Sequence, residues 1–405
     1  MPALRIIARD ADSRARAGVL ATAHGEVRTP AFVPLATRAS VRGLEPGRVA
    51  ALGYEMVLGN TFHLFLRPSG ELIEELGGLH DFMGWRRSVI TDSGGFQVFS
   101  MGHGTVADEI KGSRGGPREG AILAIDEEGV RFRSYIDGSV HFMGPETSMA
   151  VQAQLRSDIV LAFDECTPFH VDRAYTAAST QRTHRWLDRA IAWRTQHAAA
   201  PSAPGDGGSL FYGIVQGGVY EDLRAQSTAA AVASGAEGIA VGGSLGREKA
   251  QMHEVVDWST RELERIAGER PRHLLGIGEI DDLIRGVELG IDTFDCAMPT
   301  RLARHGVALV ADPASRWRLS IDAPAWRRSA EPLDASCPCT ACAAGLSRAY
   351  LHFLARTREA TGASLLTEHN LTFVAALMAA LRAAIVDGDL GAVAAALRAG
   401  GSPHP

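Results

Sequence analysis

Short runs rich in apolar and β-branched residues recur along this chain, and helical patterns separate most of them. We predict eight strands, over residues 29–34, 55–59, 88–91, 158–163, 211–215, 238–241, 273–275 and 291–294. Helices are predicted over residues 46–52, 145–156, 173–198, 220–234, 247–266 and 280–289. Strands that alternate with helices indicate βα units and a parallel sheet. Eight such units are the number that a closed barrel requires, so the predicted fold class is α/β, a TIM (β/α)8 barrel.

The predicted strand ends carry a set of polar and glycine residues. In a barrel of this kind the chemistry lies at the C-terminal ends of the strands. Each aspartate could instead be a helix N-cap or a turn residue, and for any single one that is the simpler interpretation. Three acids together, beside glycines that expose backbone N–H groups, favour one shared pocket. The residues at these ends are Asp92, Asp164, Gln216, Gly243, Gly276 and Asp295.

The chemistry of these side chains favours reaction at a sugar carbon. No histidine-rich or cysteine-rich ligand set lies among the three carboxylates. Carboxylates in such a group cleave glycosidic bonds: one attacks the anomeric carbon, and another manages the proton of the leaving group. Gln216 and the Gly243 N–H add mixed donors and acceptors, which suit the edge of a planar base. Phe96 could stack on that base.

A Cys-x-Cys-x2-Cys motif at Cys337, Cys339 and Cys342 is the most specific local signal. Three thiolates and one imidazole make a closed tetrahedral zinc site of the structural kind. His369 is the predicted fourth ligand, and His352 is its competitor. Three incidental free thiols are an unlikely alternative at this spacing. We therefore expect one structural Zn2+ per chain.

The length of 405 residues suits one large barrel with additions. We expect the barrel over residues 1–310, a zinc-binding subdomain over 311–375 and a helical tail over 376–405 that packs on the barrel. Residues 111–120 are expected to form a mobile loop, and residues 129–143 a hairpin that turns at Asp137 and Gly138. No apolar run reaches membrane-spanning length and no signal-peptide pattern is present, so we expect a soluble cytoplasmic protein without membrane contact.

Charge is distributed unevenly along the sequence. The formal net charge is −6, which argues weakly against a nucleic-acid partner. Between Cys296 and Arg358, however, nine arginines and four acids leave a local positive excess. This excess fits a phosphate-binding surface or an ordinary solvated face about equally well. Arg301 and Arg304, close to Asp295, are the candidate phosphate contacts.

Five ordered motifs resemble those of the queuine tRNA-ribosyltransferases, also called tRNA-guanine transglycosylases. The resemblance covers nearly the whole chain, from about residue 29 to beyond His369. The motifs are residues 91–97 (TDSGGFQ), 163–168 (FDECTP), 213–218 (GIVQGG), 294–301 (FDCAMPTR) and the cysteine segment with its later histidine.

The resemblance implies a reaction and roles for individual residues. Members of the family exchange guanine at the wobble position (34) of tRNAs with GUN anticodons, those for Asp, Asn, His and Tyr, for a 7-deazaguanine in queuosine biosynthesis. By resemblance, Asp295 is the nucleophile on ribose C1′ and Asp92 is the general acid/base. The substrate-binding set that it implies is Asp92, Phe96, Asp164, Gln216, Gly243, Ser244 and Leu275. The family also implies a TIM barrel with a zinc subdomain, a homodimer, and no ATP or redox cofactor.

The identity of the incoming base depends on two positions. Gly246 stands where bacterial members carry valine, and a small residue there is associated with enzymes that take the bulkier queuine. Cys166 follows the bacterial pattern, which accepts preQ1, and we favour preQ1 over queuine or preQ0. A non-catalytic tRNA-binding partner subunit would need neither Asp92 nor Asp295. A barrel glycosidase for small substrates would need neither the arginine excess nor the cysteine segment.

Overall fold

The structure, a computed structural model, describes residues 3–102, 122–197 and 208–404. The loop expected over residues 111–120 lies outside the described residues. Eight parallel strands form a closed barrel, in which each strand pairs with its neighbour along the chain and β14 pairs with β4. The strands are β4 (Ala31–Ala36), β5 (Met56–Gly59), β6 (Ser88–Thr91), β10 (Ile159–Leu161), β11 (Leu210–Val215), β12 (Gly238–Val241), β13 (Arg272–Leu274) and β14 (Thr293–Cys296). All eight overlap the predicted runs, which confirms the TIM barrel.

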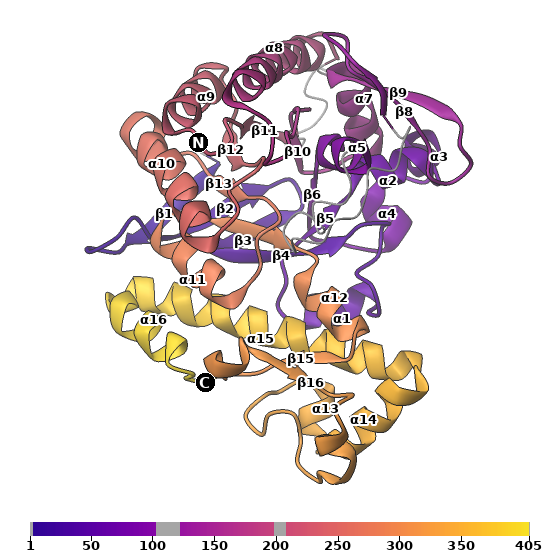
Figure 1. The fold of residues 1–405 in the computed structure, drawn as a ribbon, viewed down its shortest axis with the longest axis vertical. Helices are drawn as coiled ribbons and strands as arrows, with labels where there is room; N and C mark the ends of the chain where they lie inside the picture. Colours follow the sequence, from indigo (N-terminus) through magenta and orange to yellow (C-terminus); the bar gives the residue numbers. More distant parts are fainter. Residues whose placement is uncertain (1–2, 103–121, 198–207, 405) are drawn as a thin grey trace.

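Helices surround the barrel, as Figure 1 shows. α11 illustrates why these segments become helices: Ile280, Ile284 and Val287 recur at helical spacing and are buried against the barrel. The helices that follow the strands are α1 (Pro46–Ala51), α2 (Thr61–Leu66), α3 (Gly70–Glu75), α4 (Leu79–Met83), α5 (Gly95–Gly102), α7 (Pro145–Leu155), α8 (Arg173–His197), α9 (Glu221–Ala233), α10 (Lys249–Ala267), α11 (Ile280–Glu288) and α12 (Met298–Arg304).

An antiparallel sheet precedes the barrel, where no strand is predicted. It consists of β1 (Leu4–Arg9), β2 (Arg16–Thr22) and β3 (Gly25–Thr29). Leu4, Leu20 and Val27 pack in one core with inward residues of the barrel strands. The N-terminal end of the barrel is therefore closed by apolar packing, which leaves the opposite end for chemistry.

The insertion between β6 and β10 forms a second small sheet. Its strands are β7 (Ile122–Ile125), β8 (Val130–Arg133) and β9 (Val140–Met143). β8 and β9 pair in the register Arg133↔Val140, which confirms the predicted hairpin. Gly138 in the turn has a φ of +76°, a conformation that glycine adopts without strain.

The C-terminal part starts with β15 (Val307–Leu309) and β16 (Arg318–Ser320), which pair with each other. Two 3-10 turns (Pro313–Ser315 and Pro324–Arg328), α13 (Thr340–Ala343), α14 (Arg348–Thr357), α15 (Ala360–Asp387) and α16 (Leu390–Arg398) complete it. α15 contacts α13 and α14 and also β4, β1 and α11 of the barrel region. The domain limits expected at 310 and 375 thus fall between two paired strands and inside one continuous helix.

α15 corrects one expectation from the sequence. By length and composition it could cross a membrane, although no run of that length is predicted. In the molecule, however, 61% of its most apolar window is buried, and the Tyr54 hydroxyl donates to the Leu371 carbonyl at 2.8 Å. These contacts are those of a core helix that joins the cysteine segment to the barrel wall.

Candidate active site

Three aspartates meet at the C-terminal end of the barrel. Asp92 follows β6, Asp164 follows β10, and Asp295 lies in β14. The charges of Asp295 and Asp164 both act on Asp92. The carboxylates predicted from the strand ends therefore share one site.

Asp92 is held by the segment that follows β5. The Asn60 side-chain amide donates to Oδ2 of Asp92, and the Thr61 backbone N–H donates to Oδ1 at 2.9 Å. Burial and the neighbouring negative charges raise the pKa of Asp92 to about 7, although the hydrogen bond from Thr61 lowers it. A carboxyl with this pKa can both give and take a proton near neutral pH.

Asp295 has one fixed oxygen and one open oxygen. The His273 ring Nε2 and the Gly276 N–H both contact Oδ1 of Asp295, each at 3.1 Å. His273 is fully buried, and its Nδ1 lies 2.8 Å from the Thr293 hydroxyl. Within the described part of the chain, Oδ2 of Asp295 has no protein hydrogen-bond partner. The carboxylate is thus oriented, and one oxygen stays available to a substrate.

Asp164 and Gln216 form a buried pair beside these carboxylates. The Gln216 Nε2 donates to Oδ2 of Asp164 at 2.5 Å, and the Ser93 hydroxyl donates to Oδ1 at 3.0 Å. Burial raises the pKa of Asp164 to about 6, although these two hydrogen bonds lower it. The buried Oε1 of Gln216 has no partner among the residues that the structure describes. An unsatisfied buried acceptor is costly unless a ligand supplies the donor.

The glycine predicted at the end of β12 is required by its surroundings. Gly243 has a φ of +77°, and a Cβ atom there would lie 2.0 Å from Oε1 of Gln216. The carbonyl of the next residue, Ser244, accepts from the buried Arg224 guanidinium at 2.9 Å. Close approach of backbone to a side chain or a ligand is a common reason for glycine.

Phe96, the predicted stacking residue, and Leu275, from the predicted substrate-binding set, flank these strand ends. Phe96 lies at the start of α5, and its side chain is 44% exposed. Leu275 directly follows β13, is partly buried, and packs close to Gly242. Phe96 therefore comes from the helix after β6 and Leu275 from the loop after β13, close in sequence to Asp92 and Gly276.

Asn60 and His273 are site residues that are not among the predicted ones. Asn60 directly follows the second predicted strand, so the strand-end rule itself identifies it. His273 lies inside β13, two residues before Leu275, and alternation along the strand places both on one face. The contact of His273 with Asp295 depends on the register between β13 and β14, and spacing along the sequence does not determine that register.

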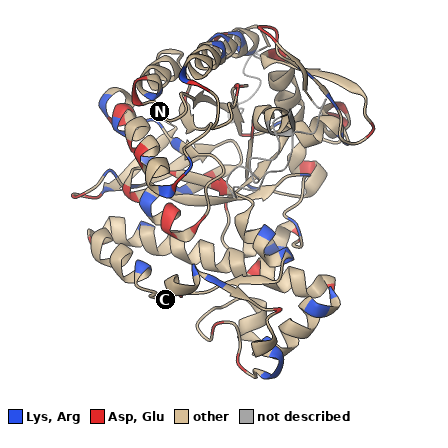
Figure 2. Ribbon diagram, in the orientation of Figure 1, with Lys and Arg blue, Asp and Glu red and all other residues tan. Residues whose placement is uncertain are grey.

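Three arginines gather beside this end of the barrel. Arg42, Arg301 and Arg304 are exposed, and none of them forms an ion pair with an acid among the described residues. Burial and the charges of Arg42 and Arg301 lower the pKa of Arg304. In the ribbon of Figure 2, Lys and Arg positions are blue at α12 and near α1. Cations that lack acidic partners are free to bind phosphates.

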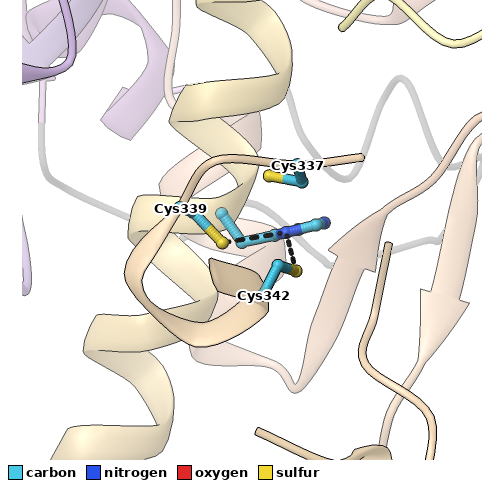
Figure 3. A group of neighbouring side chains, drawn as sticks. Cys337, Cys339 and Cys342 are labelled. Carbon is cyan, nitrogen blue, oxygen red and sulfur yellow. Dashed lines mark hydrogen bonds between the residues drawn. The ribbon is translucent and has the colours of Figure 1, made fainter. Parts of the chain in front are cut away.

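The cysteine segment and α15 bring four potential metal ligands together. Cys337, Cys339, Cys342 and His369 are all buried, and their ligand atoms lie within 4.8 Å of one another (Figure 3). The Nδ1 of His369 lies 3.4 Å from the Cys339 sulfur and 3.5 Å from the Cys342 sulfur. The competitor His352 is not part of the group, and its Nδ1 lies 2.9 Å from the Ile321 carbonyl.

The His369 ring is oriented for metal binding. Its Nε2 lies 2.8 Å from the Leu309 carbonyl. A proton on Nε2 leaves the Nδ1 lone pair facing the thiols, as metal-ligating histidines require. The donor set and its orientation therefore fit a bound metal ion.

Comparison with known proteins gives consistent matches along the chain. A family model described as queuine tRNA-ribosyltransferase matches residues 10–400. The queuine tRNA-ribosyltransferase of Roseiflexus sp. (strain RS-1) is 46% identical over 389 residues, which cover 95% of this chain and 96% of the relative. That of Herpetosiphon aurantiacus is 43% identical over 93% of this chain and 87% of the relative. The matches span the barrel, the cysteine segment and α15, and the chain belongs to the queuine tRNA-ribosyltransferase family.

Proposed function

We propose that this enzyme exchanges guanine 34 of tRNAs with GUN anticodons for preQ1, through a covalent bond between Asp295 and ribose C1′. The observation that carries the proposal is the pairing of an oriented Asp295, which has one open oxygen, with an Asp92 whose pKa is raised to about 7. Carboxylates in such different environments can divide nucleophilic and proton-transfer roles between them.

In the first half-reaction, Oδ2 of Asp295 attacks C1′ while the bond from C1′ to the guanine nitrogen breaks. Protonated Asp92 gives its proton to the departing guanine and becomes a carboxylate. In the second half-reaction, Asp92 takes the proton from the incoming base, whose nitrogen attacks C1′. The bond from C1′ to Asp295 then breaks, and both aspartates return to their starting states. One glycosidic bond replaces another, so no energy-supplying cofactor is needed.

The purine is held by its edge and its two faces. Asp164 offers acceptors to the ring and exocyclic N–H groups, while Gln216 and the Gly243 N–H complete the edge contacts. Phe96 and Leu275 cover opposite faces of the ring, and Ser244 borders the site. Stacking contributes about 1–3 kcal/mol per base.

Preference for preQ1 over queuine rests on positions 166 and 246. Gly246 has a φ of +111°, and a Cβ atom there would lie 2.7 Å from the Gln251 side chain. The local backbone conformation is therefore a sufficient reason for glycine at position 246, and no space for the larger base queuine is needed to explain it. Cys166 is partly exposed in the loop after β10, where the bacterial pattern has a cysteine.

The metal, the tRNA contacts, the oligomeric state and the location complete the proposal. Cys337, Cys339, Cys342 and His369 hold one structural Zn2+, because three thiolates and an imidazole are the ligand set of closed zinc sites. Arg301 and Arg304 bind tRNA phosphates, and two chains form a homodimer in the cytoplasm.

Base competition tests this proposal. Exchange of labelled guanine into a GUN tRNA is measured with preQ1, preQ0 or queuine as competitor, and a tRNA without guanine at position 34 is the control. We expect strong competition by preQ1, weak competition by queuine and no labelling of the control. Preferred competition by queuine would contradict the base assignment, and the absence of guanine exchange would contradict the reaction.

A further inference from the structure

Arg224 of α9 is a fully buried arginine, and it contacts no carboxylate among the described residues. Its guanidinium donates instead to four backbone carbonyls. Nε contacts Gly218 O at 2.8 Å, Nη1 contacts Val215 O at 3.1 Å and Gly242 O at 2.8 Å, and Nη2 contacts Ser244 O at 2.9 Å. Burial lowers the pKa of Arg224 to about 9. A buried cation without a counter-charge is costly, so its position needs a reason.

The four carbonyls belong to the ends of β11 and β12 and to the loops that follow them. These ends carry Gln216 and Gly243, the two residues proposed to read the edge of the base. Only a planar guanidinium with five donors can hold carbonyls from both loops at once. Arg224 therefore fixes the distance and orientation between the two loops.

Peptide geometry gives Arg224 a direct effect on the Gly243 N–H. The carbonyl of Gly242 points to Arg224 at 2.8 Å. In a trans peptide the N–H of the next residue points to the opposite side of the same plane. Holding Gly242 O therefore turns the Gly243 N–H away from α9, and this N–H has no partner within the part of the chain that the structure describes.

Ser227 lies one turn after Arg224 in α9 and acts on the other loop. Its hydroxyl accepts from the Gln216 backbone N–H at 3.0 Å. It is fully buried, as Arg224 is. One face of α9 thus holds carbonyls of both loops and the backbone of Gln216.

We propose that Arg224 and Ser227 are positioning residues that set the base-reading edge, so that they determine affinity and selectivity for the purine. This inference rests on the proposed exchange of purine bases. A purely structural role would match that of Arg16, which is as buried but lies at the opposite end of the barrel. Arg16 holds Asp292 at 2.8 and 2.6 Å, before β14 starts.

The test compares Arg224→Lys and Ser227→Ala with Arg16→Lys as the matched control. Equilibrium binding of guanine and of 2-aminopurine, which lacks the O6 acceptor, is measured together with the KM for tRNA. A lysine keeps the charge but cannot span four carbonyls. A tenfold loss of affinity corresponds to about 1.4 kcal/mol. We expect Arg224→Lys to weaken guanine binding about tenfold or more, and to reduce the preference for guanine over 2-aminopurine by a similar factor. The KM for tRNA should change less than about twofold.

The outcomes separate the two proposals. Ser227→Ala should weaken guanine binding about threefold, because one hydrogen bond is lost. If Arg224→Lys does not fold, Ser227→Ala alone tests the positioning role of α9. Unchanged guanine affinity and selectivity in the folded variants would overturn the positioning role, and so would an equal loss in Arg16→Lys. A wild-type enzyme that exchanges no guanine would instead overturn the proposed function.

Discussion

Asp92 shows how the surroundings of one residue prepare it for chemistry. Loss of water and the charges of Asp295 and Asp164 raise its pKa to about 7, while the Thr61 N–H stabilises the ionised form. An exposed aspartate has a pKa near 3.9 and is almost fully ionised at neutral pH. The site therefore keeps a substantial fraction of Asp92 protonated at neutral pH.

The rate of covalent adduct formation should depend on this proton. If protonated Asp92 releases guanine, the single-turnover rate is highest below pH 7 and falls about tenfold per pH unit above it. Rapid quenching of enzyme–tRNA mixtures between pH 6 and 9 measures this decrease in rate. The single-turnover rate of Asp92→Asn should be low at every pH. A decrease above pH 7 like that of the wild type, in this variant, would contradict the role of Asp92 as the proton donor.

At the residue scale, the position of active sites at the C-terminal ends of barrel strands predicted the three acids, but not all of the residues that hydrogen-bond to them. Asp92, Asp164 and Asp295 each follow or end an apolar run, so their convergence follows from the barrel. The contact of His273 with Asp295 joins two strands through their register, His273↔Thr293. The proposed positioning role of Arg224 depends on the directions of four backbone carbonyls. These directions cannot be predicted from the pattern of side chains in the sequence.

At the scale of elements, α15 links the thiol cluster to the barrel. His369 lies in the same helix that contacts β4, so a metal on the four ligands would order the segment before α13 against the barrel wall. The segment from β16 to α13 contains only short turns, and a small region of this kind commonly needs a metal.

Removal of one thiol should remove the metal. We expect about one zinc per chain in the wild-type protein and almost none in Cys339→Ser, because a closed site needs all four ligands. Cys296→Ser is the matched control, since Cys296 lies outside the cluster and its loss should leave the zinc content unchanged. Elemental analysis of purified proteins measures this, and full zinc in Cys339→Ser would refute the site.

A second cluster joins the N-terminal sheet to the barrel. His24 Nδ1 and His80 Nε2 lie 2.8 and 3.1 Å from the two carboxylate oxygens of buried Asp158. The two rings are stacked with centroids 3.6 Å apart, and their ligand atoms and those of Asp158 lie within 4.8 Å of one another. We interpret this cluster as a hydrogen-bonded clamp on the Asp158 carboxylate.

This clamp should stabilise the fold in a pH-dependent way. Burial alone would raise the pKa of Asp158, but hydrogen bonds from His80, the Val89 N–H and His24 outweigh it and lower the pKa. The stabilisation is present above the unfolded pKa near 3.9 and is lost as pH falls through the folded value. We expect Asp158→Asn to reduce the free energy of unfolding by about 3 kcal/mol at pH 7, because hydrogen bonds to a buried charged group are weakened. Denaturant unfolding measures this change. An equal loss of unfolding free energy at pH 3 would contradict the dependence of the stabilisation on ionised Asp158.

At the scale of the whole molecule, the barrel keeps its two ends distinct. The sheet of β1, β2 and β3 closes one end, while the carboxylates and the exposed arginines Arg42, Arg301 and Arg304 occupy the other. The eight barrel strands were predictable because each is a buried apolar run between helical patterns. β1 was not, because Ile7 is apolar although it lies at an outward position and is 55% exposed, so the residues of β1 do not alternate between apolar and polar.

The cationic end should dominate binding of tRNA. We expect Arg301→Ala or Arg304→Ala to weaken binding and to reduce the slope of log K against log salt by about 0.7–0.9, the value of one phosphate contact. Arg5→Ala is the control, because Arg5 is exposed on β1 near the closed end. An unchanged slope in both arginine variants would place the phosphate surface elsewhere.

Asp295 is the centre of this account, and its substitution is the most direct test. We measure incorporation of labelled guanine into a GUN tRNA, together with tRNA binding, for the wild type and for Asp295→Ala. The variant should lose exchange completely and form no covalent adduct that survives denaturation. Its tRNA affinity should stay within about tenfold, because phosphate contacts dominate that affinity. Retained exchange in Asp295→Ala would contradict the account.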